Sequence, residues 1–595
     1  MKKFLLTLSM VLAASATFAV PAKPIKKVLT LADGTQITAT LHGDEFLNWW
    51  EADNGSRYVA SAEDNNVYVA ANMDVMKATA EARRAPISQA RAERMAKVHS
   101  NAMTAKNGGP LRVGIGADHI TYTGKKKGII ILVQFADTKF ATGHDNAYYD
   151  MVANERNLKH SDGYIGSVSD WFLDQSNGKF ELDFDVKGPY TLKHTASYYG
   201  KNSTTSDDKV GYMIRDACDS AAVNGTNFND YDWDGDGYAD QVFVLYAGRG
   251  EATGGGAETV WPHMYKVGYT VIGRPLSYTS EGKGKVNTYA CSNEIDPVYT
   301  DEGYWTGALR PAGIGTICHE FSHCLGYPDM YDTDNSSGNY GCGEFDVMCS
   351  GSYNGNGFIP CNYTAYERIY AGWTEPIELN EPATVNSMIS ATDYGRPFIL
   401  YNDKNNDEYF LLENRQPTGW DQAIYGSNGL LITHIDYDKT VWDINKVNGS
   451  SQDHQRCALV PADNSATKMS LDDVRNDLYP YVSDNEVQND EFTDDSRPAA
   501  KLYNKNADGT KYLGKPITGI ARNGDGTMSF VVMDGDDNNI LDNTPVETGI
   551  SGVTTATKNA DSRVYSIDGR YMGNDINKMG KGLYIVGGKK ELKNK

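Results

Sequence analysis

Cysteine and histidine are both scarce in this chain. Only 8 of its 595 residues are Cys and 11 are His. Small secreted scaffolds that rely on disulfides are dense in cysteine, so this content excludes a disulfide-based scaffold. The scarcity of histidine gives weight to any place where two His stand at ligand spacing, because chance seldom produces such a pair.

Positive charge is in deficit as well. The 56 Lys and Arg are outnumbered by 78 Asp and Glu, which gives a formal net charge of −22. A surface with this balance repels phosphate groups, so we expect no nucleic-acid partner. An acidic balance favours solubility and also suits calcium-binding loops.

Apolar runs of membrane-spanning length are missing from the chain. The nearest approach is residues 1–19, MKKFLLTLSMVLAASATFA, in which two lysines precede about a dozen mostly apolar residues. This run is too short for a stable span, and it ends in small residues, although Thr17 stands where Ala is usual. We expect a signal peptide that is cleaved after Ala19, no transmembrane segment, and a secreted or cell-surface product.

The rest of the chain divides into three parts. Residues 20–109 contain two hairpin patterns, a basic stretch and a Gly-rich linker, which favours a propeptide over an ordinary accessory domain. Residues 110–535 carry strand and helix patterns without a clean break, which predicts one large α+β catalytic unit. Residues 545–595 hold short alternating runs, which fit a sorting or surface-attachment tail or, alternatively, a terminal β-appendage.

The most informative stretch reads H-E-x-x-H-x-x-G-x-x-D, from His319 to Asp329. Residues four apart share one face of a helix, so His319 and His323 can bind one metal ion together. Glu320 projects beside them and can reach a metal-bound water without being a ligand. Gly326 suits a left-handed turn that ends the helix and returns the chain, so that Asp329 becomes the third ligand. Three protein ligands and one open position are typical of catalytic zinc.

A second residue competes for the third ligand position. Glu367, in the helix-like stretch AYERIYAGW, would supply a carboxylate from a later helix. The spacing after the turn at Gly326 favours Asp329.

Four further side chains are candidates for the site. Met348 lies in the Gly- and Ser-rich stretch GEFDVMCSGSY and can form an apolar floor beneath the histidines. Tyr353 follows it and is a candidate oxyanion donor. His263 and His434 are candidate cleft residues, although a structural role suits each of them better.

A second metal signal precedes the motif. The stretch DWDGDGYAD places carboxylates at alternate positions around a glycine turn, as calcium loops do. Phe243 occupies the position at which an EF-hand has Glu, so the loop is not an EF-hand. We expect a structural calcium site, with a solvated acidic turn as the alternative, and its ligands would be Asp232, Asp234, Asp236 and Asp240.

Taken together with VQFADTKF, SNGKFEL, DYDWDGDGYADQVFVLYAGRG, VWPH and EYFLLENRQPTGWD, the motif resembles the immune-inhibitor-A-type secreted metallopeptidases over residues 128–534. This resemblance implies a metzincin-like zincin fold with an active-site helix, preceded by a propeptide. It also implies zinc bound by His319, His323 and Asp329, Glu320 as the catalytic base, and Met348 in a Met-turn. The end of the chain, VYSIDGRYMG and GLYIVGGKKEL, resembles short tail domains that direct type IX secretion.

The expected function is a secreted, zymogenic zinc endopeptidase that hydrolyses proteins or peptides with Glu320 as general base. The alternatives are a non-catalytic surface adhesin on a protease fold and a zinc hydrolase of smaller substrates. Latency cannot use a cysteine, because residues 20–109 contain none. A carboxylate of Asp44 or Glu45 could replace the catalytic water, or the segment could block the cleft.

Overall fold

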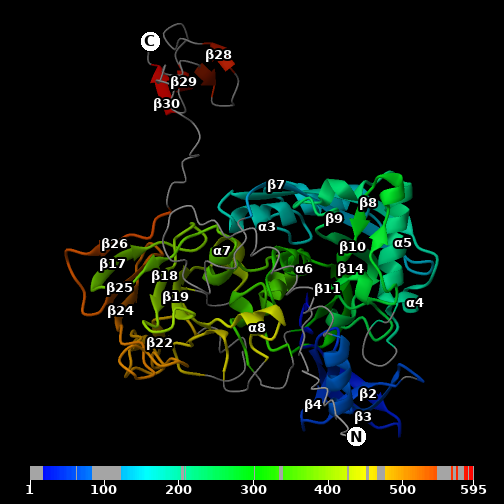
Figure 1. Ribbon diagram of the computed structural model, residues 1–595, viewed down its shortest axis with the longest axis horizontal. Coiled ribbons are helices and arrows are strands. Elements are labelled where there is room, and N and C mark those ends of the chain that lie inside the picture. The colour runs from blue at the N-terminus through cyan, green and yellow to red at the C-terminus, as the bar shows by residue number, and fades with distance from the viewer. Residues whose placement is uncertain are drawn as a thin grey trace, which may run out of the picture. The chain divides into compact units, whose positions relative to one another are not determined.

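The computed structural model forms two compact units, residues 1–544 and residues 545–595 (Figure 1). It describes residues 18–61, 63–83, 122–202, 207, 209–300, 302–333, 339–424, 428–449, 454–465 and 476–545, together with the tail strands named below. Most of the predicted signal peptide, and most of the basic stretch and linker after it, lie outside the described residues.

The first part of the larger unit is a closed barrel. Its strands are β2 (Lys26–Leu31), β3 (Gln36–Gly43), β4 (Asn48–Ala52), β5 (Arg57–Ala60) and β6 (Val67–Ala70), and β2 pairs with β6 in parallel to close it. The hairpin patterns of the sequence are thus confirmed as β2–β3 and β5–β6. Gly34 makes the first of these turns with a left-handed φ of +84°. The barrel has its own small core, formed by Ile25, Leu29, Ala39, Leu41, Trp50 and Tyr68.

A seven-stranded sheet organises the next part. Its order is β1-β11-β14-β10-β7-β8, with β15 paired to β14. The strands are β1 (Phe18–Ala19), β7 (Gly124–Gln134), β8 (Phe180–Thr191), β10 (Val242–Arg249), β11 (His263–Lys266), β14 (Thr288–Tyr299) and β15 (Trp305–Pro311). Neighbours among β8, β7, β10 and β14 run parallel, whereas β11 and β15 run antiparallel to β14. The apolar runs 129–133 and 242–247 are fully buried, as central parallel strands require.

Helices cover this sheet and carry the motif. Those that precede the motif are α2 (Asn146–Asn154), α3 (Val168–Gln175), α4 (Ala196–Gly200) and α5 (Val210–Val223). The helices α2, α3 and α5 contact β8, while the motif helix α6 (Gly315–Ser322) contacts β11 and β14. The motif therefore lies at the antiparallel end of the sheet. A small sheet of β9 (Tyr238–Ala239), β12 (Leu276–Ser277) and β13 (Lys285–Val286) completes this part.

Two further sheets form the last part of the larger unit. The first has the order β16-β18-β19-β20-β21, with β16 (Ile377–Glu378), β18 (Phe398–Tyr401), β19 (Glu408–Arg415), β20 (Gly429–Asp436) and β21 (Cys457–Leu459). The second has the order β24-β25-β17-β26, with β17 (Ala383–Met388), β24 (Ile517–Arg522), β25 (Met528–Val532) and β26 (Ile540–Leu541). Side chains from both sheets share one core, which includes Phe398, Phe410, Val385 and Phe530. The remaining elements are α7 (Ala365–Tyr370), α8 (Lys439–Asp443) and the hairpin β22 (Tyr481–Ser483) with β23 (Glu486–Asn489).

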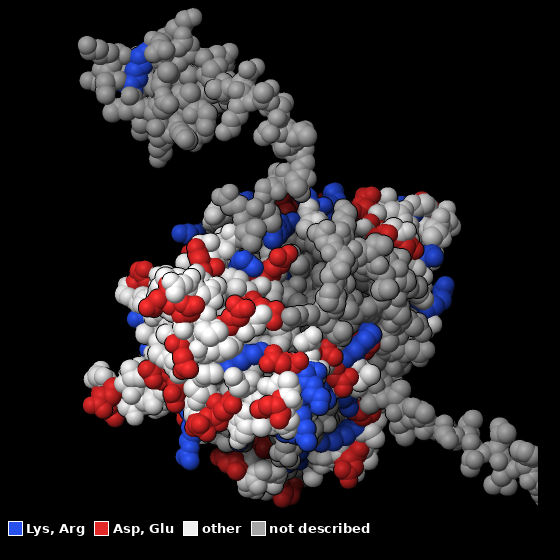
Figure 2. Space-filling view, turned by 60° about the vertical axis from the view of Figure 1, so that its left-hand side comes forward, with Lys and Arg blue, Asp and Glu red and all other residues white. Residues whose placement is uncertain are grey.

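The smaller unit is a four-stranded sheet of order β28-β27-β29-β30, formed by β27 (Val564–Ser566), β28 (Tyr571–Gly573), β29 (Gly582–Val586) and β30 (Lys589–Lys593). The chain as a whole mixes helices with sheets, as the α+β prediction requires. The described part of the chain contains no helix with the length and apolarity of a membrane span. Acidic side chains are spread over the described part of the face drawn in Figure 2, in keeping with the net charge of −22.

Candidate metal centre

The helix that carries the motif is short and closely packed at both ends. It continues into one 3₁₀ turn, η5 (His323–Leu325), and ends at Gly326, whose φ of +96° is left-handed as predicted. At its start, Gly315 has no room for a side chain, because a Cβ atom there would lie 1.8 Å from the carbonyl oxygen of Ser352. The surrounding chain thus holds the helix in place.

Three ligand atoms converge at this helix. Nε2 of His319 lies 3.2 Å from Nε2 of His323, and Asp329 Oδ1 lies 3.1 Å and 3.5 Å from these two nitrogens. All three side chains are buried. A tetrahedral zinc ion with ligands at about 2.05 Å places neighbouring ligand atoms about 3.3 Å apart. The spacing of the three atoms therefore fits zinc.

Backbone carbonyls orient both histidine rings. Nδ1–H of His319 donates to the carbonyl of Val347 at 2.7 Å, and Nδ1–H of His323 donates to the carbonyl of Tyr327 at 2.8 Å. Because a carbonyl can only accept, each ring carries its proton on Nδ1 and a lone pair on Nε2. Three lone-pair atoms consequently face one another in a buried space, and a bound cation would relieve their repulsion.

Asp329 is held from two distant parts of the chain. Its N–H donates to Asn445 Oδ1 and its Oδ2 accepts from Asn445 Nδ2, both at 2.6 Å. The N–H of the next residue, Met330, donates to the carbonyl of Met348 at 2.9 Å, so the predicted Met-turn fixes the chain beside the carboxylate. Burial raises the pKa of Asp329 above its ordinary value, although contact with His319 opposes this rise.

Glu320 lies next to the ligands with one oxygen unused. Its side chain is fully buried, and Oε1 accepts the N–H of Val20 at 3.0 Å. Oε2 has no hydrogen-bond partner among the described residues. Burial, and then the charge of Asp329, raise the pKa of Glu320 well above its ordinary value, while the Val20 N–H lowers it. A carboxyl group in this position can take up and deliver protons.

Two ring donors bind the same N-terminal segment. The hydroxyl of Tyr353 donates to the carbonyl of Pro21 at 2.7 Å, and Nε1–H of Trp261 donates to the carbonyl of Val20 at 3.3 Å. The candidate oxyanion donor Tyr353 therefore contacts a peptide carbonyl. Its part in a reaction stays a prediction.

Glu367 does not join the three ligand atoms. It lies in α7, where Oε2 accepts a hydrogen bond from the Thr364 hydroxyl. The group of residues that could hold an ion consists of His319, His323 and Asp329. The geometry therefore favours Asp329 as the third ligand.

The two candidate cleft histidines, His263 and His434, form contacts typical of a structural role. Nδ1–H of His263 donates to the Trp261 carbonyl at 2.6 Å, Nε2 accepts from the Tyr289 hydroxyl at 2.9 Å, and burial lowers the pKa of His263 to about 4. This ring therefore stays neutral at physiological pH. His434 lies in β20, where its Nε2 is 3.1 Å from Glu408 Oε1 and its ring stacks on that of Tyr503.

The acidic loop brings together three of its four predicted ligands. Carboxylate oxygens of Asp232, Asp234 and Asp240 lie within 4.8 Å of one another, whereas Asp236 is outside this group. The loop is also supported by its own amides, because Asp232 accepts the N–H groups of Gly235 and Gly237, each at 2.8 Å. Asp236 instead accepts the N–H of Tyr238 at 2.9 Å.

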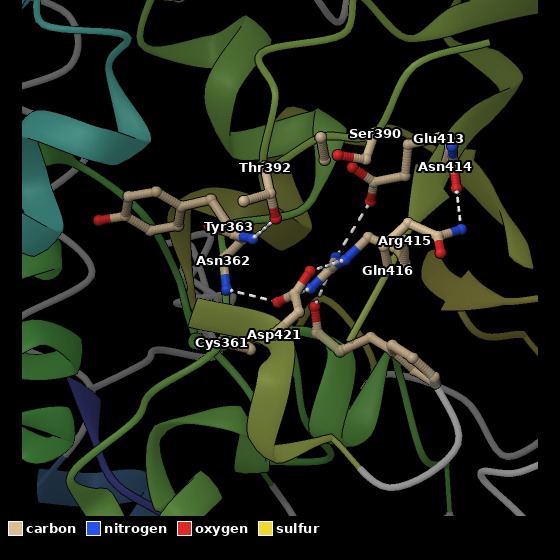
Figure 3. A network of polar contacts seen from close by, with 12 residues as sticks. Cys361, Asn362, Tyr363, Ser390, Thr392, Glu413, Asn414, Arg415, Gln416 and Asp421 are labelled. Carbon is tan, nitrogen blue, oxygen red and sulfur yellow. Dashed lines mark hydrogen bonds and ion pairs between the residues drawn. The ribbon is translucent and has the colours of Figure 1, made fainter. Parts of the chain in front are cut away.

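A buried charge network connects the C-terminal sheets to the Met-turn (Figure 3). Arg415 is fully buried and binds both carboxylate oxygens of Asp421, at 2.6 Å and 2.8 Å. It also donates to the carbonyl of Phe345 at 3.0 Å and contacts Glu413 at 3.3 Å. Glu413 in turn accepts from Arg368 at 2.7 Å. Phe345 lies two residues before Val347, whose carbonyl orients His319.

Several contributors to the site carry no signal in the sequence. Asn445, which holds Asp329, lies in an ordinary turn-like stretch more than a hundred residues away. Val20 and Trp261 reach Glu320 and the N-terminal segment only through the tertiary fold. The Phe345 carbonyl is bound by Arg415 from β19. The spacing of residues along the sequence does not identify these partners, because each contact joins residues that are far apart in the chain.

Comparison with known proteins agrees with this geometry. The profile of the family described as immune inhibitor A peptidase M6, catalytic domain, matches residues 120–373. The pre-pro-metalloprotease PrtV of Vibrio cholerae serotype O1 is 24% identical over 342 residues, which cover 50% of this chain and 36% of the relative. Immune inhibitor A of Bacillus thuringiensis subsp. alesti is 25% identical over 298 residues, which cover 43% of this chain and 42% of the relative. The chain thus spans less than half the length of either relative. Over residues 120–373 the chain is therefore similar to the catalytic domain of the immune inhibitor A, or M6, metallopeptidases.

Proposed function

We propose that this protein is an exported zinc endopeptidase, made as a zymogen, that hydrolyses peptide bonds in proteins. The observation that carries the proposal is the group of three buried lone-pair atoms, at the spacing of tetrahedral zinc, with the Glu320 carboxyl beside it. Proteolytic activity also accords with the family match and with the two metalloprotease relatives.

Different residues of the site would have different roles in peptide hydrolysis. Zinc, when bound by His319, His323 and Asp329, would polarise the scissile carbonyl and increase the acidity of water. Glu320 takes the proton from the attacking water and delivers it to the leaving nitrogen. The hydroxyl of Tyr353 binds the backbone of the N-terminal segment at the Pro21 carbonyl, and its role as oxyanion donor stays a prediction.

The N-terminal region would keep the enzyme latent by covering the site. Val20 and Pro21 bind Glu320 and Tyr353 beside the candidate metal centre. Next to the barrel strand β4, the ring of Phe46 packs with its centroid 5.9 Å from that of Tyr265 in β11. Asp44 is buried close enough for its charge to raise the pKa of Asp329, although burial is the larger cause of that rise. Asp44 Oδ1 accepts the N–H groups of Phe46 and Leu47, and replacement of the catalytic water by Asp44 or Glu45 stays a prediction. Cleavage within residues 84–109 would then release the region.

The acidic loop is proposed as a structural calcium site. Hard oxygen ligands and a glycine turn are what calcium requires, and the three grouped carboxylates repel one another without a cation. Asp232, Asp234 and Asp240 are the proposed ligands, whereas Asp236 would contribute only by orienting the loop.

Export is proposed from the N-terminal pattern. The relative from Vibrio cholerae is named a pre-pro-metalloprotease, a name that gives that protein a leader and a pro-region. For this chain we propose a leader that ends at Ala19, a propeptide over residues 20–109, and a tail over 545–595 that engages secretion machinery or the cell surface.

The experiment compares the zinc-loaded wild type with Glu320→Gln, both after activation by limited proteolysis, in casein and peptide hydrolysis. Removal of a general acid–base group lowers the rate by about 10² to 10⁴. We expect that loss while zinc content and thermal stability stay close to wild type. Equal turnover by the two proteins would reject Glu320 as the base, and absence of turnover in the zinc-loaded wild type would favour a binding protein.

A further inference from the structure

An extended segment of the chain runs through the candidate metal centre. Val20 is fully buried against Ala252 and Trp261, and Tyr353 packs against the same cluster. Beyond the contacts of Glu320, Trp261 and Tyr353 described above, the N–H of Lys23 donates to the carbonyl of Ala252 at 3.0 Å. All four contacts engage the peptide backbone of the segment.

The contact of Val20 with Glu320 indicates where the leaving nitrogen of a substrate would lie. A group that delivers a proton to the leaving nitrogen must lie within hydrogen-bond reach of that nitrogen. The Val20 nitrogen lies 3.0 Å from Glu320 Oε1. It therefore stands where the leaving nitrogen of a bound substrate would stand.

The residues that precede the Val20 nitrogen pair with an edge strand of the large sheet. Phe18 and Ala19 form β1, which pairs antiparallel with β11, and Ala19 lies opposite His263. In the described chain, β11 pairs with β14 on one side and only with β1 on the other. An extended peptide can add to such an edge through backbone hydrogen bonds that do not depend on its sequence.

We propose that this segment marks the path of the substrate, and that Ala252, Trp261 and Tyr353 form the subsite for the residue on the amine side of the cleaved bond. This assignment rests on the proposed peptidase function. The residues before the bond pair with β11, and the residue after it places its side chain in the apolar pocket that Val20 fills. The substrate class is an extended peptide with a small aliphatic residue, such as Val, directly after the cleaved bond.

The chemistry of the pocket sets the selectivity. Trp261 and Ala252 are almost completely buried, so a charged side chain in this place would lose water and gain no partner from the residues of the pocket. The other contacts bind backbone atoms and cannot discriminate between side chains. Selection is consequently concentrated at one position of the substrate.

The same register places the N-terminus that cleavage of the proposed leader peptide would produce. Cleavage after Ala19 would give Val20 a free amino group at the position from which an amine product departs. The processed N-terminus would then occupy the site as a product does, with its carbonyls still bound by Trp261 and Tyr353.

The test profiles cleavage of a peptide library by the full-length, zinc-loaded chain after activation by limited proteolysis. We expect the residue after each cleaved bond to be Val or another small aliphatic residue, with charged residues disfavoured roughly tenfold or more. Hydrolysis without selection at this position would overturn the proposal.

Three variants refine the test. Ala252→Leu fills the pocket and should shift the preference from Val towards Gly and Ala, by roughly tenfold in kcat/KM. Trp261→Phe keeps an aromatic ring but removes the N–H, and should lower kcat/KM about fivefold for all substrates. Trp305→Phe, at a half-exposed position on β15, is the matched control and should change neither quantity. An unchanged preference in Ala252→Leu would contradict the assignment.

A binding measurement separates this proposal from the peptidase function. In the full-length Val20→Arg variant the segment should leave the pocket, because the new charge cannot be buried there. Calorimetry should then show that the peptide Val-Pro-Ala-Lys-Pro-Ile binds at least about tenfold more tightly than Arg-Pro-Ala-Lys-Pro-Ile. That difference in a chain that hydrolyses no peptide even after limited proteolysis would uphold a binding pocket for the side chain of Val and reject the peptidase function. Equal binding of the two peptides would reject the subsite.

Discussion

Each of the two proposed ligand histidines is oriented by a backbone carbonyl rather than by a side chain. The Val347 carbonyl that binds His319 belongs to the Met-turn, and the Tyr327 carbonyl that binds His323 follows the turn at Gly326. A carbonyl acceptor sets the tautomer that presents Nε2 to the metal. The ligand geometry therefore depends on the backbone path of two turns.

Metal content tests the ligand assignments at the residue scale. Asp329→Ala should lose zinc, because only two ligands remain, whereas Glu367→Gln should retain it, because Glu367 lies outside the ligand group. Asp240→Asn should retain zinc and lose calcium. Elemental analysis of the purified proteins measures both metals together. Zinc that is retained by Asp329→Ala and lost by Glu367→Gln would reverse the assignment.

Glu367 also predicts a dependence of stability on pH. Burial raises its pKa from 4.5 to about 7. As pH rises above 4.5, the unfolded chain releases this proton first, so the free energy of unfolding falls until the folded group ionises near pH 7. Glu367→Gln removes this titration and keeps an acceptor for the Thr364 hydroxyl. The stability of the wild type relative to the variant should therefore decline between pH 4.5 and about 7, as calorimetric melting at several pH values would measure. Parallel melting profiles would contradict the prediction.

At the scale of elements, the Met-turn is supported from the C-terminal sheets. Arg415 at the end of β19 binds the Phe345 carbonyl, and Met348 binds the segment that contains Asp329. The turn thus connects a buried ion-pair network with two of the proposed metal ligands, His319 and Asp329. Residues beyond 373 accordingly lie in the same compact unit as residues 120–373, which match the family profile.

Substitution of Arg415 tests this support. Arg415→Met leaves Asp421 buried without its main partner, while Glu413 keeps Arg368, and loss of one member of a buried pair costs about 3–5 kcal/mol. Lys125→Met, in an exposed ion pair with Asp183, is the control and should cost less than about 1 kcal/mol. Denaturant unfolding measures both changes, and zinc titration of the folded fraction should show weaker binding only in Arg415→Met. Similar stability of the two variants would argue against the network.

At the scale of the whole molecule, the segment that precedes the barrel is paired with the catalytic sheet. The chain enters through β1 on the sheet, passes Glu320 at Val20, and only then forms the barrel. The N-terminal region is therefore joined to the site by its first described residues, in addition to the packing of Phe46 against Tyr265. Under the proposed latency, removal of the barrel would therefore open the site.

Limited proteolysis tests this coupling. The intact chain should hydrolyse peptides slowly, because its own segment occupies the position of the substrate. Trypsin cleavage at the basic residues between 84 and 109 should weaken the hold of the barrel and raise the rate, since proteolytic removal of a pro-segment releases a blocked state. Rates before and after cleavage, with N-terminal sequencing of the products, measure the effect. Equal rates would show that the N-terminal region does not inhibit.

The features that the sequence by itself determined are those set by local spacing. The 3.6-residue period places His319 and His323 on one face, a left-handed turn requires Gly326, and the alternation of apolar residues defines the barrel hairpins. Each of these depends on neighbours within a few residues, so no knowledge of the rest of the chain was needed.

The tertiary structure decided the remainder, because it concerns contacts between residues far apart along the chain. The choice of Asp329 over Glu367 follows from the position of its carboxylate beside two ring nitrogens and from Asn445 behind it. The contact of Val20 with Glu320 joins residues 300 positions apart. Sequence patterns carry no information on such distances, since many folds could accommodate the same local preferences and only the packing of the whole chain selects among them.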